Sequence, residues 1–121
     1  MAIAFGAALG LGLSNQGARI TFEALKESGV TFVLRNAASA EKHQIETMVG
    51  GVAVFDFDND GRPDIFFANG ARQPDLRKTG KEYWNRLYRN LGQGKFEDVT
   101  ERSGLQGEGF SIGAAAADFD N

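Results

Sequence analysis

Short apolar segments separated by glycine and polar turns run through the chain from Arg19 onward, a pattern typical of β-strands. The pattern predicts strands at residues 20–25, 30–34, 52–55 and 65–68. Residues 52–55 form a continuous apolar run, which favours a strand that is buried on both faces. Helical periodicity does not persist beyond about two turns anywhere in the chain. We therefore predict an all-β fold.

A β-hairpin is predicted in the later part of the chain. Residues 86–89 and 95–99 flank the glycine-rich segment 91–94, which is the kind of segment that closes a hairpin. Residues 36–43 and 70–82 are polar, and we expect both to be loops.

The central apolar segment and the acidic residues after it recur at the C-terminus. The last four residues, 118–121, repeat residues 56–59 at an offset of 62, and residues 113–117 match residues 51–55 in kind. Because the second copy stops in the middle of the motif, we expect the chain to be a fragment of a longer array of repeats.

Composition excludes several classes of function. The 16 glycines against 2 prolines indicate many tight turns, and a net charge of -3 without a basic face disfavours nucleic-acid binding. The absence of cysteine excludes disulfides and any zinc or iron–sulfur site built on thiolates. The single histidine, His43, lies in a polar stretch, which disfavours histidine-based metal sites and catalytic triads.

Residues 56–64, which we call the acidic loop, carry carboxylates at loop positions 1, 3, 5 and 9 and a glycine at position 6. Four negative charges within nine residues repel one another unless a cation lies among them. The glycine permits a sharp bend, and oxygen ligands in this number favour Ca²⁺ over Mg²⁺. The predicted ligands are Asp56, Asp58, Asp60, Asp64 and the backbone carbonyl of Arg62, with a second, partial site at Asp118 and Asp120.

The acidic loop does not fit an EF-hand. That motif needs a glutamate at position 12, where this chain has Phe67, and it needs flanking helices where this sequence predicts strands. A solvated acidic turn that binds nothing is the alternative, and the ordered spacing with its recurrence at Asp118 and Asp120 disfavours it.

Residues 2–13 form an uncharged run of apolar residues and glycine. The run is shorter than the roughly 20 residues that a transmembrane helix needs, so no membrane span is expected. Its length fits the apolar region of a signal peptide, although no cationic residue precedes it and the first is Arg19. Four interpretations of residues 1–18 stay open: a partial signal peptide, a disordered leader, a translation artefact of a truncated reading frame, or a buried strand at the start of the fold.

Two segments of the chain resemble a known repeat. Residues 51–67 resemble the FG-GAP/VCBS repeat of calcium-binding β-propellers, and residues 85–100 resemble the strand–turn–strand that follows it. Together with residues 103–105, the pattern is similar to the cartilage acidic protein family and its bacterial relatives that carry ASPIC/UnbV domains. The resemblance implies that residues 19–121 are part of a β-propeller, with about two blade-length repeats of which the second is truncated.

The resemblance also implies calcium in the loops between strands, a secreted, extracellular or periplasmic location, and binding rather than catalysis. The expected function is a calcium-binding repeat segment that acts in recognition or adhesion, with calcium as a structural ion and no enzymatic activity of its own. The expected partners are an unidentified protein or carbohydrate ligand and the remaining blades of the propeller. The alternative is the scaffold portion of a propeller enzyme whose catalytic residues lie outside this fragment.

Overall fold

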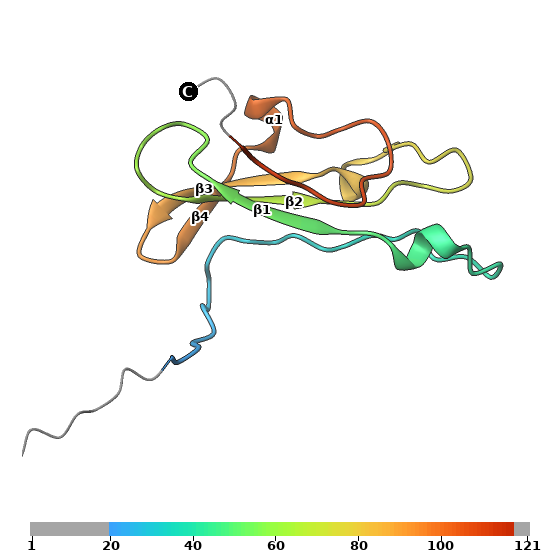
Figure 1. The fold of residues 1–121 in the computed structure, drawn as a ribbon. Coiled ribbons are helices and arrows are strands. Elements are labelled where there is room, and N and C mark those ends of the chain that lie inside the picture. The colour runs from blue at the N-terminus through green and yellow to red at the C-terminus, as the bar shows by residue number, and fades with distance from the viewer. Residues whose placement is uncertain (1–19, 118–121) are drawn as a thin grey trace, which may run out of the picture.

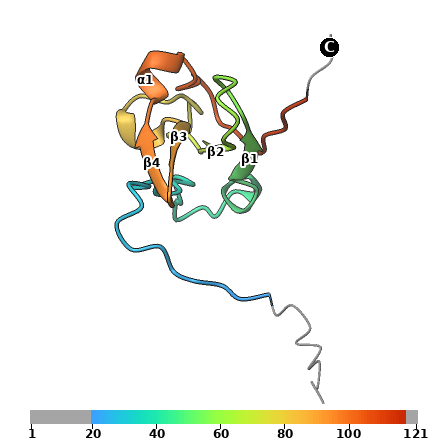
Figure 2. The same cartoon turned by 90° about the vertical axis from the view of Figure 1, so that its left-hand side faces the viewer.

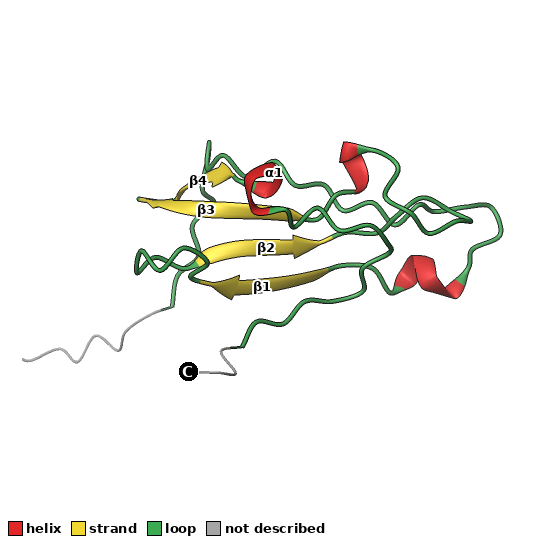
Figure 3. Cartoon of the chain, turned by 90° about the horizontal axis from the view of Figure 1, so that it is seen from above, coloured by secondary structure: helices red, strands yellow, loops and turns green. Residues whose placement is uncertain are grey.

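A four-stranded antiparallel sheet organises the chain in a computed structural model, which describes residues 20–117 (Figure 1). The strands follow one another in space as they do in sequence, in the order β1-β2-β3-β4, and regular helix is confined to single turns (Figure 3). The prediction of an all-β fold is therefore confirmed.

Within residues 20–117, no helix is long and apolar enough to cross a membrane. The elements are η1 (Gln44–Thr47), β1 (Gly51–Phe55), β2 (Asp64–Ala68), η2 (Lys81–Tyr83), β3 (Arg86–Gly92), β4 (Lys95–Asp98) and α1 (Thr100–Ser103).

The first hairpin joins the two most apolar segments of the chain. β1 pairs with β2 in a continuous register that runs from Gly51 opposite Ala68 to Phe55 opposite Asp64. This pairing confirms the two strands predicted at residues 52–55 and 65–68. It also fixes the acidic loop as the connection at the closed end of the hairpin.

The second hairpin joins β3 to β4 through Gln93 and Gly94. Both residues have positive φ, at 53° and 72°, which is the conformation that a two-residue hairpin turn of type I′ requires. A register shift between Asn90 and Gly92 precedes the turn. The predicted hairpin around residues 91–94 is therefore confirmed.

The two faces of the sheet are covered by different extended segments. Adjacent residues of a strand point to opposite faces, so Phe66 and Phe67 of β2 face different neighbours. The ring of Phe67 stacks on Phe32 at 4.6 Å and meets Tyr88 edge-on at 5.9 Å. Phe66 lines a groove on the other face together with residues 113–116. In Figure 2, α1 lies above the sheet and residues 30–43 lie below it.

The core is centred on β3. Leu87 and Tyr88 are fully buried, and Val99 is 2% exposed. Leu87 and Tyr88 each also make a hydrogen bond that anchors a flanking segment: the backbone N–H of Leu87 donates to Thr100 Oγ1, and Tyr88 Oη accepts from the backbone N–H of Thr31. The core therefore holds both α1 and the segment around Thr31 to the sheet.

Residues 20–25 and 30–34, which were predicted as strands, do not form strands. Among the described residues, the backbone of residues 20–34 makes one hydrogen bond to the sheet backbone, from Phe96 N–H to the Ser28 carbonyl at 2.7 Å. Positive φ at Glu27 and Gly29 turns the chain away before a ladder can continue. Further along, Thr31 bonds to a tyrosine hydroxyl rather than to a strand backbone.

The prediction that β1 is buried on both faces is also wrong for the described chain. Val52 and Val54 are 57% and 61% exposed, whereas Ala53 between them is 9% exposed. The reason is that β1 is an edge strand, and Phe32 covers the neighbouring Phe67 of β2 instead. One side of β1 therefore presents two large apolar side chains to solvent.

Glu46 in η1 is a buried carboxylate that closes the segment leading into β1. It is 7% exposed and accepts hydrogen bonds from the Ser39 hydroxyl, from the backbone N–H groups of Ser39 and His43, and from the Gln73 amide. The bonds from Ser39 hold the pKa of Glu46 below its ordinary value of 4.5, and burial opposes them only in part.

We expect the variant Glu46→Gln to flatten the acid dependence of stability. A carboxylate whose pKa is lower in the folded state stabilises the protein above its unfolded pKa, and that contribution is lost as the pH falls below about 4.5. Urea unfolding between pH 3 and pH 7 measures this slope. Glu41→Gln, at an exposed position nearby, is the matched control. Equal slopes for the wild type and Glu46→Gln would contradict the assignment.

Candidate metal centre

The acidic loop closes the β1–β2 hairpin. Asp56 follows directly after β1, and Asp64 is the first residue of β2. Asn59 and Gly61 have φ values of 57° and 82°, so the chain turns through two left-handed residues between the strands. Glycine adopts this conformation without strain and asparagine tolerates it better than most residues, which explains their place in the loop.

The loop is folded around its own first carboxylate. Asp56 accepts hydrogen bonds from the backbone N–H of Asp60 at 3.1 Å and of Gly61 at 2.8 Å, one on each oxygen. Asp60 in turn accepts from the backbone N–H of Arg62 at 3.0 Å. Side chains of this type commonly bond to backbone groups a few residues ahead, and here they fold the loop back on itself.

Asp64 connects the acidic loop to β3. Its carboxylate is fully buried, and its two oxygens accept hydrogen bonds from the backbone N–H of Phe57 at 2.9 Å and of Asn90 at 2.7 Å. The side chain of Asn90 completes the connection by donating to the Pro63 carbonyl at 2.9 Å. The loop and the end of β3 are therefore held as one unit.

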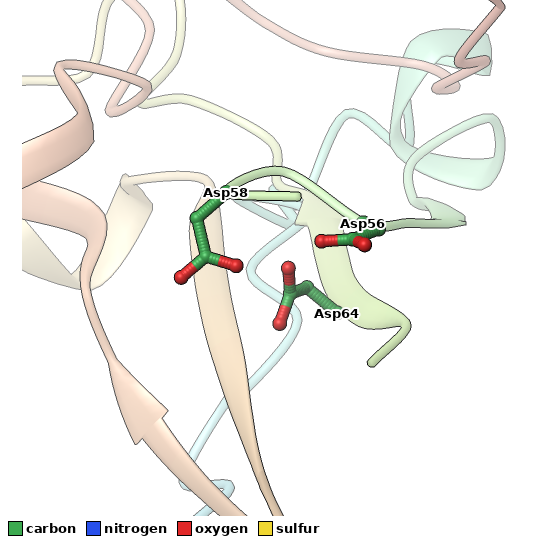
Figure 4. Close-up of side chains that lie close together, drawn as sticks. All are labelled: Asp56, Asp58 and Asp64. Carbon is green, nitrogen blue, oxygen red and sulfur yellow. The ribbon is translucent and has the colours of Figure 1, made fainter. Parts of the chain in front are cut away.

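Three carboxylates converge at this point. Asp56, Asp58 and Asp64 each offer one oxygen, and these oxygens lie within 4.8 Å of one another (Figure 4). Two oxygens that share a Ca²⁺ ion at 2.3–2.6 Å can be up to about 5 Å apart, so this spacing fits a common ion. A carboxylate oxygen keeps a second lone pair after it accepts a backbone hydrogen bond, so it can still bind a metal ion. All three are hard oxygen ligands, the type that calcium prefers.

Two arginines neutralise the outer part of the loop. Arg89 of β3 lies with Nε 2.6 Å from Asp58 Oδ2 and donates from Nη2 to Asp60 Oδ2 at 3.0 Å. Arg62 pairs with the same oxygen of Asp60 and donates from Nε to the Asn90 carbonyl at 2.8 Å. Burial alone raises the pKa of Asp60, but the hydrogen bonds and charges of Arg62 and Arg89 outweigh it and hold the pKa below its ordinary value.

The structure thus brings together three of the predicted ligands, Asp56, Asp58 and Asp64. Asp60 is close by, but its carboxylate is bound to arginine, and its role as a ligand and that of the Arg62 carbonyl stay predictions. Asp118 and Asp120, the proposed start of a second site, lie outside the described residues.

Sequence reasoning missed Arg89 and Asn90. They come from β3, more than 20 residues after the loop, and only the pairing of β2 with β3 brings them to it. A cation and an amide in a strand that follows an acidic loop are too common to identify them in advance.

We expect Asp64→Asn to destabilise the protein by about 1–3 kcal/mol in the presence of a chelator, because an amide leaves one of the two backbone donors without an acceptor. Urea unfolding in EDTA measures the change. Asp75→Asn, at an exposed position in another loop, should leave the free energy of unfolding within about 0.5 kcal/mol of the wild type. A similarly small effect of Asp64→Asn would mean that the loop is not held through this carboxylate.

The comparison with protein families agrees with this architecture. Residues 56–121 match the family described as FG-GAP-like repeat, a match that begins at the first aspartate of the loop. A four-stranded antiparallel sheet is the form of a β-propeller blade. Neither the curated proteins nor the solved structures contain a match to the chain. By this match, which covers more than half of its length, the chain belongs to the FG-GAP-like repeat family.

Proposed function

We propose that the chain is a calcium-binding segment of an exported β-propeller that acts in recognition or adhesion, with calcium as a structural ion. The observation that carries the proposal is the convergence of Asp56, Asp58 and Asp64 at the closed end of the β1–β2 hairpin. Asp60 and the Arg62 carbonyl complete the ligand set that the loop spacing predicts. The ion supplies positive charge to the loop and takes no part in a reaction.

A structural role for the ion is supported by what the ligands connect. Asp56 ends β1, Asp64 begins β2, and Asp64 is also bonded to the backbone of Asn90 in β3. An ion shared by these carboxylates would hold three strands at one end of the sheet. Binding to the folded state only would stabilise that state by mass action.

A role as one blade among several is supported by the groove on the face of Ala53 and Phe66. Residues 113–116, which match the start of β1 in kind, line this groove. A segment at the position of the next repeat therefore packs on the sheet of the present one, as expected where each repeat buries its apolar face against a neighbour. The remaining blades are the first partners that we propose, and a protein or carbohydrate ligand is the second.

The proposed affinity supports an exported location. Sites of this kind in extracellular modules bind calcium with dissociation constants on the order of 10⁻⁴ to 10⁻³ M, which only the calcium of a secreted or periplasmic environment would fill. The similarity of residues 51–67 and 85–100 to the cartilage acidic protein family and its ASPIC/UnbV-associated relatives points the same way. We propose binding rather than catalysis for this segment.

We expect isothermal titration of the 121-residue chain to give one calcium site with a dissociation constant on the order of 10⁻⁴ to 10⁻³ M. Asp58→Ala should weaken binding by about tenfold or more, because it removes a converging oxygen while the backbone bonds of Asp56 and Asp64 remain.

The matched control is Asp75→Ala, which removes an exposed aspartate outside the acidic loop and should leave the affinity unchanged. No heat of binding at millimolar calcium would refute the site. Equal affinity for the wild type and Asp58→Ala would mean that the ion binds elsewhere.

A further inference from the structure

Arg89 places a positive charge beside the candidate calcium site. Its guanidinium spans Asp58 and Asp60, with Nε 2.6 Å from one carboxylate and Nη2 3.0 Å from the other. Asp58 is shared: one of its oxygens belongs to the converging group with Asp56 and Asp64, and the carboxylate also carries the ion pair with Arg89. The arginine therefore occupies a carboxylate that the proposed ion also needs.

The contact between Arg89 and Asp58 is close but not aligned as a hydrogen bond. Arg89 Nε is buried and has no hydrogen-bond partner among the described residues, although Asp58 Oδ2 is within ion-pair distance. A buried N–H without an aligned acceptor is held by charge rather than by geometry.

Asp60 also pairs with a second cation, Arg62. Its Oδ2 pairs with Arg62 as well as with Arg89, and its Oδ1 accepts from the backbone of Arg62. These bonds keep the Asp60 carboxylate on the arginine side, outside the group of converging oxygens. The charge of Arg89 thus bears on two of the residues that the loop spacing assigns to calcium.

We infer that Arg89 is a built-in counter-cation that competes with calcium for Asp58 and Asp60 and thereby sets the affinity of the site. The inference rests on the proposed calcium binding and deepens it. Without the ion, Arg89 offsets the repulsion among the aspartates and keeps the loop folded. With the ion, its positive charge opposes the binding of a second cation at the same carboxylates.

The test compares Arg89→Gln with Arg86→Gln by calcium titration of the full chain. Both variants remove one positive charge from β3, but Arg86 lies three residues away on the opposite face and pairs with Asp98. We expect Arg89→Gln to bind calcium about tenfold more tightly than the wild type and Arg86→Gln to stay within about twofold of it.

Thermal unfolding gives a readout that does not depend on the titration. In EDTA, Arg89→Gln should melt below the wild type, because the loop has lost a counter-charge. Saturating calcium should shrink or abolish this difference. Should Arg89→Gln fail to fold, Arg89→Lys serves in its place, since a lysine keeps the charge but lacks the fork that reaches two carboxylates, and it should bind calcium more tightly than the wild type by a smaller factor.

Equal or weaker calcium binding by the Arg89 variants, with a wild type that binds, would overturn the competition and leave the proposed function standing. Binding by Arg89→Gln but not by the wild type would support the competition at Asp58 and Asp60, but it would refute calcium binding by the wild-type chain and with it the proposed function. The absence of binding in every variant would overturn both the proposed function and this inference.

Discussion

The pairing of β1 with β2 gathers the aspartates of the acidic loop at one end of the hairpin, where oxygens of Asp56, Asp58 and Asp64 lie within 4.8 Å of one another. The mutual repulsion of these carboxylates is the constraint on which the rest of the structure depends. The loop offsets it from within and from outside. Asp56 is stabilised by backbone N–H groups of the loop itself, whereas Asp64 takes one of its two donors from β3. Asp58 and Asp60 are neutralised by Arg89 of the same strand. The first hairpin is therefore complete only when the third strand is in place.

β3 makes this dependence reciprocal. Arg89 and Asn90 bind the acidic loop. Leu87 and Tyr88, immediately before them, form the centre of the core and anchor α1 and the segment around Thr31. Because Arg89 and Asn90 directly follow Leu87 and Tyr88 in β3, a change in charge at the loop bears on residues that pack the core. A structural ion at the loop would thus act on the whole sheet rather than on a surface turn.

The sequence could predict those parts of the fold and of the candidate site that depend on consecutive residues. The hairpin at Gln93 and Gly94 and the loop between β1 and β2 are written in consecutive residues, and both were predicted correctly. The segments at residues 20–25 and 30–34 have the composition of strands, but they contact the sheet mainly through side chains such as Phe32, which no local pattern reveals. The convergence of Asp56, Asp58 and Asp64 follows from their spacing, whereas the part played by Arg89 follows only from strand pairing.

Residues 51–55 carry valines where residues 113–117 carry alanines, and the close approach of the two segments explains this difference in side-chain size. A Cβ atom added at Gly51 would lie 2.6 Å from the Cα of Gly113, so the backbones of β1 and of the C-terminal segment pass each other without room for a side chain. The glycine at the start of each copy makes this contact feasible. The alanines after Gly113 have side chains small enough for the segment to lie against Ala53 and Phe66. Valines in their place, as in β1, would have to be accommodated in the same groove. The small residues of the second copy are thus suited to resting on the sheet of the first, while Val52 and Val54 leave the opposite side of β1 apolar and exposed.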